Sequence, residues 1–329
     1  MIYFLIIFSN FFFLIFFKEI SKYINIFDLP DNKRKIHNKK IPLLGGWFFL
    51  FNIICYLIYE LVINKSNTFE IFGFRESLPS IIFFFSLIFI FLIGCFDDKI
   101  KLSAKIRLIL LSLIILINLL VNPELNISLI KLSFMSSFSI ENFSFFWTFL
   151  CFLLFINALN FFDGINLQSS GLIYSICVFF LYKNIFFDFF VVIFITNTFF
   201  IYLNYNSKIF LGNSGSFFLS FLFGSLFISS YNNSISLVAD EIVVLMLIPG
   251  LDLLRLFFLR IINKTNPMTA DNNHIHHYLI KKFSNTKSAL IIQSLTWIPF
   301  FFSQYLGQIH LVLIAQTICY FLIIGRYKN

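Results

Sequence analysis

The chain has 329 residues, of which 59% are hydrophobic and 12% are charged, and its mean hydropathy is +0.89. Soluble domains carry about 25% charged and about 45–50% apolar residues, so this composition excludes an ordinary soluble protein. It predicts an all-α integral membrane protein. The five cysteines stand singly in apolar runs, which is typical of core residues and excludes a disulfide framework or a paired-cysteine metal site.

Long apolar runs define the expected spans, because only helices or closed barrels satisfy the backbone in lipid and these runs are too uniform for barrel strands. Eleven spans are expected, with ten as the alternative, since the sixth and seventh fall short of the roughly 20 residues that a crossing helix needs. The first span is expected to be a retained helix and not a signal peptide, because no basic region precedes it and no small-residue cleavage site follows it. Residues 1–329 are expected to form a single polytopic domain. The expected spans are residues 2–17, 43–63, 78–96, 106–121, 143–159, 169–182, 186–202, 214–229, 242–259, 289–305 and 309–324.

The basic residues are distributed unequally between the two sets of connecting segments. If the segment after the first span is cytoplasmic, that face collects all but four of the 24 Lys and Arg residues. The bias follows the positive-inside rule, so the net charge of +8 is a topology signal and no nucleic-acid partner is expected. The polar motifs then share the cytoplasmic face, whereas a transporter would place its polar groups near mid-bilayer. The cytoplasmic loops lie near residues 18–42, 97–107, 160–168, 204–215 and 260–287.

Two adjacent carboxylates, Asp97 and Asp98, end the third expected span, and several basic residues follow them. Neighbouring carboxylates repel each other unless cations compensate their charge. The pair is therefore either a solvated helix end or an Mg²⁺ or acid–base site, because hard cations prefer oxygen ligands.

A polar stripe in the sequence NALNFFDGIN ends the fifth expected span. Its polar positions recur every third residue, so on a helix they would share one face and line a pocket, with a capped helix end as the alternative. Gly164 is expected to let the backbone turn as it leaves the membrane. The stripe consists of Asn157, Asn160, Asp163 and Asn166.

Two further motifs and one buried carboxylate complete the set of candidates. FLGNSGS precedes the eighth span, where helix-start amides favour a phosphate group, although a plain loop fits as well. HIHH supplies three of the five histidines, and phosphate contact is preferred over zinc because no fourth ligand or i,i+4 pair is present. Asp252 lies in an apolar run and is either a functional residue or paired with Arg255 or Arg260.

Together these motifs resemble the polyprenyl-phosphate N-acetylhexosamine-1-phosphate transferases of glycosyltransferase family 4, which are related to the phospho-N-acetylmuramoyl-pentapeptide transferases. The resemblance runs from about residue 28 to residue 279. Within the superfamily, RKIH and HIHH look more like the undecaprenyl-phosphate GlcNAc-1-phosphate transferase branch, because the muramoyl branch shows three consecutive histidines. The matching segments are DLPDNKRKIHNKKIPLLGG, the aspartate pair, N-x-x-N-x-x-D-G, F-x-G-x-x-G-S and P-x-x-x-D-x-x-H-x-H-H.

The resemblance implies an enzyme of the bacterial inner membrane that faces the cytoplasm and acts with Mg²⁺, or alternatively Mn²⁺. It would move a sugar 1-phosphate from a UDP-sugar onto polyprenyl (undecaprenyl) phosphate and release UMP, as the first step of a cell-envelope glycan such as lipopolysaccharide O-antigen. Asp97 matches a carboxylate that takes the proton of the lipid phosphate or helps to place this phosphate, and Asp163 matches one that binds or orients the nucleotide-sugar. Asp98, Asn160 and Asn213 match the metal region. Substrate contacts are expected from Lys40, Lys105, Asn157, Asn166, His274, His276 and His277.

Two positions depart from the family pattern. Asn213 and Asn166 stand where the family has aspartates, and Leu167 replaces a glycine. An amide oxygen can bind Mg²⁺, but it carries no full charge and cannot act as a carboxylate nucleophile. A covalent intermediate at position 213 is thus excluded, and direct attack by the lipid phosphate is favoured. The alternatives are a catalytically silent paralogue that binds the same ligands, and a transporter. The expected partners are the two substrates and the lipid bilayer, with a homodimer left open.

Overall fold

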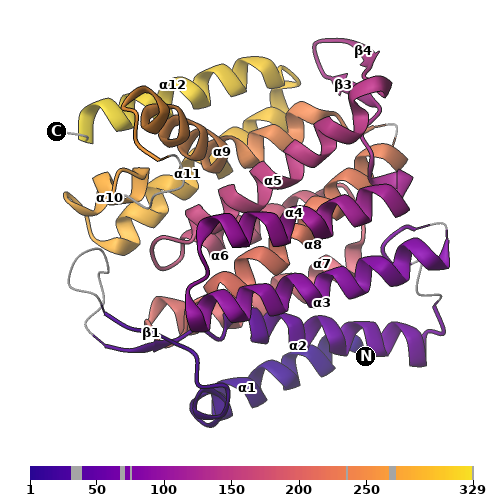
Figure 1. Ribbon diagram of the computed structural model, residues 1–329, viewed down its shortest axis with the longest axis vertical. Coiled ribbons are helices and arrows are strands. Elements are labelled where there is room, and N and C mark those ends of the chain that lie inside the picture. Colours follow the sequence, from indigo (N-terminus) through magenta and orange to yellow (C-terminus); the bar gives the residue numbers. More distant parts are fainter. Residues whose placement is uncertain (31–38, 67–70, 75, 235, 267–271, 328–329) are drawn as a thin grey trace.

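Helices make up most of the molecule in the computed structural model, which describes the chain except residues 31–38, 67–70, 75, 235, 267–271 and 328–329. Their axes run roughly parallel across the view of Figure 1, as expected for an all-α membrane protein. The helices are α1 (Ile2–Ile24), α2 (Gly45–Ile58), α3 (Ser77–Ile100), α4 (Ala104–Val121), α5 (Ser144–Phe162), α6 (Gln168–Tyr182), α7 (Phe187–Tyr205), α8 (Gly212–Asn233), α9 (Ala239–Ile262), α10 (Ile275–Ile280), α11 (Asn285–Leu306) and α12 (Ile309–Tyr327).

Within the described residues, ten helices are long and apolar enough to cross a membrane by length and composition. α7 is one of them, whereas α6 has only 15 residues, or about 22 Å of helix against a hydrocarbon core of about 30 Å. Its ends still reach opposite ends of the bundle. The Leu167 amide before α6 donates to Asn204 Oδ1 near the end of α7 (2.7 Å), and Lys183 after α6 pairs with Glu241 at the start of α9 (2.6 Å). α6 therefore runs alongside the ten long helices as a short eleventh helix of the bundle.

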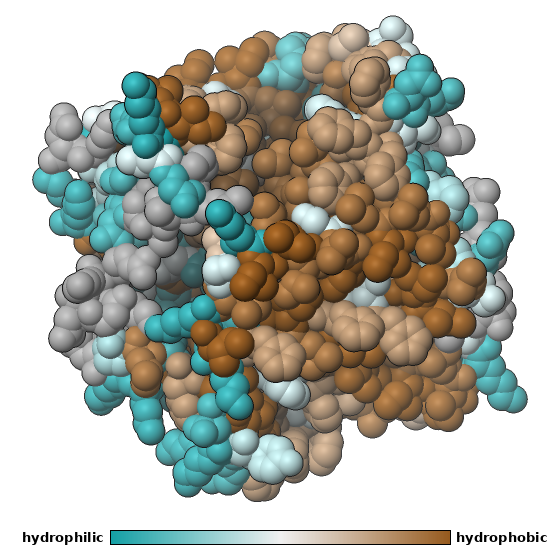
Figure 2. Space-filling model, viewed as in Figure 1, coloured by the Kyte–Doolittle hydropathy of each residue, from teal (hydrophilic) through white to brown (hydrophobic). Residues whose placement is uncertain are grey.

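The surface of the bundle is apolar over its middle. Figure 2 shows a broad hydrophobic area across the visible face, with hydrophilic residues gathered toward its left and right ends. Phe85 and Phe89 in the middle of α3 and Leu113 in the middle of α4 are 57%, 56% and 52% exposed, respectively. Large exposed apolar areas of this kind are stable in lipid and not in water, so the molecule is a multi-pass membrane protein.

α8 is the central helix, and its 18-residue apolar window is completely buried. Glycines let α2 and α3 approach its first turn. A Cβ atom on Gly46 would lie 2.4 Å from the Gly215 nitrogen, and one on Gly94 would lie 2.4 Å from the Ser214 Cα atom. Such backbone contact is possible only with small residues. The close packing places the end of α3 beside the start of α8.

We expect Gly46→Ala to destabilise the protein by about 1–3 kcal/mol, because the added methyl group meets backbone atoms that cannot move aside as a side chain could. Gly250→Ala is the matched control, since its Cβ atom would meet no heavy atom within 4 Å. In that helix interior, alanine is neutral or slightly stabilising. Melting temperatures in detergent measure the difference, and equal values for the two variants would contradict the packing.

Two short antiparallel pairs occupy opposite ends of the bundle (Figure 1). β1 (Phe27–Asp28) pairs with β2 (Ile41–Pro42), with Asp28 opposite Ile41. Leu43 bridges Phe210, and the Phe210 amide donates to the Pro42 carbonyl (3.0 Å). The second pair, β3 (Leu129–Leu132) and β4 (Met135–Ser139), lies at the other end. The first pair thus brings the chain before α2 next to the loop before α8.

Candidate functional site

A polar pocket of about 390 Å³ lies at the end of the bundle where α3 and α5 finish and α8 begins. It unites the aspartate pair, the NALNFFDGIN segment and the FLGNSGS segment, which are far apart in the sequence. The charged residues that line it are Asp28, Asp97, Asp98, Lys101 and Asp163. The neutral polar residues that line it are Asn160, Asn166, Asn204, Ser207, Asn213 and Asn285.

Carboxylates outnumber cations on the described wall of this pocket. Asp28, Asp97, Asp98 and Asp163 face one lysine, Lys101. Asp97 is buried and its charge is balanced by Arg107, whose Nη1 atom lies 3.1 Å from Asp97 Oδ2. Asp98 and Asp163 form no ion pair among the described contacts, so as carboxylates they place negative charge at the pocket that would repel an anionic ligand. A hard divalent cation would relieve this repulsion, and oxygen donors are the ligands that Mg²⁺ prefers.

Asp98 binds the first turn of α8. Its Oδ1 accepts from the Asn213 amide (2.8 Å) and its Oδ2 accepts from the Ser214 amide (3.0 Å). A carboxylate is favoured there because it satisfies amides that lack a partner within the helix and lies at the positive end of the helix dipole. The expectation that these two amides are open to a phosphate group is therefore wrong, since a side chain from α3 already occupies them.

Two residues assigned by resemblance to the metal region contact each other. Asn160 Nδ2 donates to Asn213 Oδ1 (2.8 Å) and to Ser216 Oγ (2.8 Å). The Asn213 side-chain oxygen therefore lies beside Asn160, near the end of α5. An aspartate at position 213 would accept from Asn160 with one carboxylate oxygen and would offer the other oxygen to a cation.

The polar stripe does not form one helical face, because α5 ends at Phe162. Asn157 and Asn160 lie on α5, whereas Asp163 and Asn166 follow it in the connection to α6. Asn157 Nδ2 donates to the Leu153 carbonyl (2.7 Å), and Asn157 is not part of the described pocket wall. Three of the four expected stripe residues line the pocket, and they do so from a helix end and a loop together.

Gly164 lies in a bend of the chain after α5, as expected, but it also has a second role. The positive φ of +70° in this connection belongs to Leu167, the residue that precedes α6. A Cβ atom on Gly164 would lie 2.2 Å from His276 Cε1. The glycine therefore allows the histidine ring to pack directly on the loop that carries Asp163.

The surroundings of Asp163 oppose its ionisation. Burial raises the pKa of Asp163 to about 6, the Ser169 hydroxyl opposes this rise, and the nearby Asp28 carboxylate adds to it. Ser169 Oγ donates to Asp163 Oδ1 at 2.5 Å. A carboxyl group with a pKa near neutrality can exchange a proton at working pH.

The three histidines lie behind the described pocket wall. The rings of His274 and His276 are parallel, with centroids 5.5 Å apart. Burial, with the neighbouring His277 and His274 rings, holds the pKa of His276 well below its usual value. His276 is therefore neutral near pH 7 and would meet a phosphate as a hydrogen-bonding group, without positive charge.

The remaining predicted residues lie outside the described pocket wall or outside the described residues. Lys40 is exposed, with Nζ 5.1 Å from the Phe27 ring centroid, and Lys105 is exposed beyond the end of α3. Residues 31–38, which hold most of the DLPDNKRKIH motif, and residues 267–271 of the last motif lie outside the described part of the chain. In the rest of the chain, no three His, Cys, Asp or Glu residues group together as a possible metal site.

Sequence reasoning missed Asp28 and Asn204 as pocket residues. Asp28 belongs to a matched motif, yet nothing in a single sequence pairs it with the end of α5. Asn204 Oδ1 accepts from the Leu167 amide and its Nδ2 donates to the Ile209 carbonyl (3.1 Å), so it fixes two pocket loops. An asparagine near the end of an apolar span was the available signal.

Comparison with known proteins gives two kinds of match. Residues 80–231 match the family described as Glycosyl transferase family 4. The chain is 28% identical over 290 residues to a probable undecaprenyl-phosphate N-acetylglucosaminyl 1-phosphate transferase of Bacillus subtilis (strain 168), which covers 84% of this chain and 75% of that protein. It is 24% identical over 278 residues to the undecaprenyl-phosphate alpha-N-acetylglucosaminyl 1-phosphate transferase of Thermotoga maritima, covering 83% and 79%. These matches confirm the resemblance that the motifs indicated.

Proposed function

We propose that this chain, a relative of glycosyltransferase family 4, transfers an N-acetylhexosamine 1-phosphate from a UDP-sugar to a membrane polyprenyl phosphate and releases UMP. Both relatives are named as undecaprenyl-phosphate N-acetylglucosaminyl 1-phosphate transferases. The observation that carries the proposal is the pocket at one end of a membrane-spanning bundle, where three matched motifs meet. A lipid head group and a soluble nucleotide-sugar can both reach such a position.

The pocket end is proposed to face the cytoplasm, in the inner membrane of a bacterium. The uneven distribution of Lys and Arg residues supports this orientation. UDP-sugars are cytoplasmic metabolites in the proposed reaction, so the orientation and the substrate agree. Labelling of Lys101→Cys and Ser236→Cys variants from each side of inverted vesicles would test it, since Lys101 is exposed at the pocket end of the bundle and Ser236 is exposed beyond the other end of α8.

In the proposed reaction, an oxygen of the lipid phosphate attacks the phosphorus that bears the sugar. A new P–O bond forms, the bond from that phosphorus to the bridging oxygen breaks, and UMP leaves with the electron pair. Asn213 lies at the pocket but its amide cannot serve as a covalent nucleophile, which favours direct transfer between the substrates. Asp163 is proposed to orient the nucleotide-sugar, and Asp97, held by Arg107, to place the lipid phosphate.

The oxygen-rich, acidic pocket wall fits a magnesium ion, and Mn²⁺ is an alternative of the same charge. Asp98, Asn160 and Asn213 are the residues proposed to hold it. When bound, the ion would neutralise charge between two polyanionic substrates during phosphoryl transfer. The contacts among these residues support the proposal: Asn160 Nδ2 donates to Asn213 Oδ1 and the Asn213 amide donates to Asp98 Oδ1, so the three residues lie together at the pocket.

The proposed function is tested with purified protein, polyprenyl phosphate and a panel of UDP-sugars, by measuring UMP and lipid product. The same assay tests the metal. We expect Asn213→Asp to lower the Mg²⁺ concentration for half-maximal UMP release by roughly tenfold, because it adds a carboxylate beside Asn160. Asn285→Asp, an equal charge change elsewhere in the pocket, should leave this concentration nearly unchanged.

Two results would contradict these proposals. If both aspartate variants shift the Mg²⁺ requirement equally, position 213 is not a metal ligand and only the general charge of the pocket matters. If the wild-type protein releases no UMP with any UDP-sugar at any Mg²⁺ concentration, the chain is the catalytically silent alternative.

A further inference from the structure

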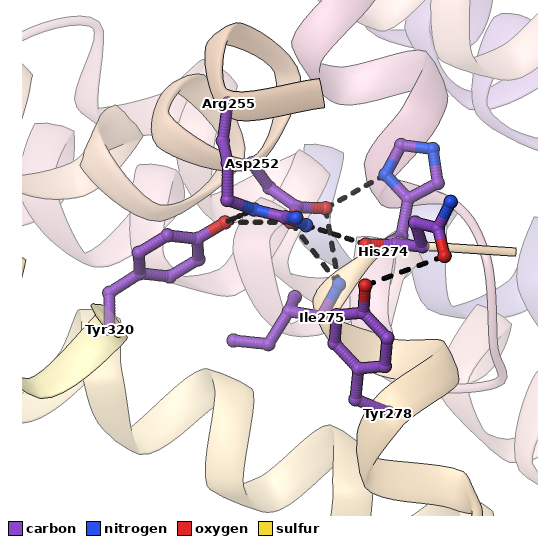
Figure 3. A network of polar contacts seen from close by, with 7 residues as sticks. Asp252, Arg255, His274, Ile275, Tyr278 and Tyr320 are labelled. Atoms are coloured by element: carbon purple, nitrogen blue, oxygen red, sulfur yellow. Dashed lines mark hydrogen bonds and ion pairs between the residues drawn. The ribbon is translucent and has the colours of Figure 1, made fainter. Parts of the chain in front are cut away.

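A buried polar network ties the histidine segment to α9 and α12 (Figure 3), and none of its residues is part of the described pocket wall. Asp252 of α9 is 4% exposed. Its Oδ1 accepts from Arg255 Nη2 (2.9 Å) and from the Tyr320 hydroxyl (2.8 Å), and its Oδ2 lies 2.8 Å from His274 Nδ1. The expected pairing of Asp252 with Arg255 is present, but it is only one part of the network.

The same network also holds the backbone on both sides of His274. The Ile275 amide donates to Asp252 Oδ1 (3.2 Å), and Arg255 Nη2 donates to the Asn273 carbonyl (2.6 Å). Arg255 Nε donates to the Tyr320 hydroxyl (2.8 Å), which closes the network. Burying ionised groups is costly, and apolar side chains would hold two helices together as well or better. The network is therefore poorly explained as a stabilising device alone.

The contact with Asp252 determines which ring nitrogen of His274 is available. A carboxylate accepts a hydrogen bond, so Nδ1 carries the proton, and Nε2 points away from Asp252 in Figure 3. The His274 ring lies parallel to that of His276, and His276 packs on Gly164 beside Asp163. The orientation of the His274 ring therefore affects the His276 ring, which contacts the loop at the pocket wall.

We infer that Asp252 is a positioning residue of the proposed transferase, acting through His274. Arg255 and Tyr320 hold the Asp252 carboxylate, and Asp252 holds the tautomer and the place of the histidine segment. By this inference α12 helps to hold the site in place, because it carries Tyr320. The inference rests on the proposed function, and it assigns a role to residues outside the pocket.

Asp252→Asn tests the inference through two readouts. The first is the ¹⁵N spectrum of the protein labelled at histidine, in which His274→Gln identifies the His274 signals. We expect wild-type His274 to show a hydrogen-bonded Nδ1–H that is lost or shifted in Asp252→Asn. The second is UMP release, where kcat should fall roughly 10- to 100-fold, as for other residues that orient a ligand from behind, with a smaller change in KM.

Two further variants separate positioning from folding. Tyr320→Phe removes one donor and keeps the carboxylate–histidine contact, so it should lower kcat only a few-fold and leave the His274 tautomer unchanged. Glu241→Gln is the matched control, because Glu241 is also a buried acid of α9 (6% exposed), paired with Lys183 at the opposite end of the helix. It should cost stability without lowering the kcat of the folded protein.

The outcomes are distinguishable. A changed His274 signal together with a lower kcat in Asp252→Asn, and normal kcat in Glu241→Gln, supports the inference. It is overturned if the His274 signal changes while kcat does not, or if Glu241→Gln lowers kcat equally. If the wild-type protein releases no UMP, the proposed function fails. The spectrum then decides about the network by itself, because an unchanged His274 signal in Asp252→Asn refutes the positioning.

Discussion

Asp98→Asn is expected to abolish sugar-phosphate transfer and to lower the melting temperature. Both oxygens of the wild-type carboxylate accept backbone amides of α8, from Asn213 and Ser214. An asparagine offers one oxygen, and its NH₂ group would face the second amide, donor against donor. Hydrogen bonds to a charged group contribute about 1.5–3 kcal/mol, and a donor left without a partner adds a further penalty. The start of α8 should therefore shift, together with Asn213.

The control must separate loss of stability from loss of chemistry. Asp240 provides it, because it is buried (2% exposed) and accepts the Ser133 amide (3.1 Å) at the opposite end of the bundle from the pocket. Asp240→Asn should lower the melting temperature while the folded fraction keeps its kcat. The folded fraction of Asp98→Asn should lose at least roughly 10³-fold in kcat. A loss of this size is expected for a residue that holds the groups that stabilise charge in the transition state. If Asp98→Asn releases UMP at the wild-type rate and melts at the wild-type temperature, Asp98 has neither the structural nor the catalytic role.

The spans were predictable from the apolar runs in the sequence, and the gathering of the polar motifs was predictable from the alternation of those spans. Apolar runs have to be helices in lipid, and the alternation of spans sends every second connection to the same face. The ends of the helices depend on distant partners instead. α5 stops at Phe162 and the chain that follows is held at Leu167 by Asn204 of α7, so the residues from Asn157 to Asn166 do not share one helical face.

Contacts between distant residues account for the other differences. The pairing of Asp252 with Arg255 was open to sequence reasoning because the residues lie one helical turn apart. Tyr320 follows Asp252 by 68 positions, and no periodicity links them. In the same way, the sequence predicts a turn at Gly164, but only the structure shows that the His276 ring also requires the space. A single sequence identifies which polar residues are unusual in an apolar chain, but not what each of them contacts.

The second large effect is expected at Asp163, where removing the charge should inactivate the protein and stabilise it. The folded pKa of about 6 exceeds the ordinary value of 3.8, a rise that corresponds to at most roughly 3 kcal/mol, less what water in the pocket restores. Because the folded-state pKa is raised, the stability contribution of this group is complete below its unfolded pKa and is lost as the pH rises through about 6. Asp163→Asn should therefore melt a few degrees higher than wild type at about pH 8, with little difference at about pH 4.

The same pKa sets the direction of the pH dependence of transfer. If Asp163 acts as a carboxylate, kcat/KM should fall as the pH decreases through about 6, because the group takes up a proton. Ser169→Ala provides the sharpest test, since the Ser169 hydroxyl stabilises the ionised form by donating to Oδ1. Its removal should raise the pKa of Asp163 further and move the acid limb of the profile to higher pH, with activity recovered in alkaline buffer. Ser175→Ala, which removes a hydroxyl on the same helix that bonds only to the Gly171 carbonyl among the contacts described, should leave the profile in place. An acid limb that stays fixed in Ser169→Ala would mean that another group limits transfer at low pH.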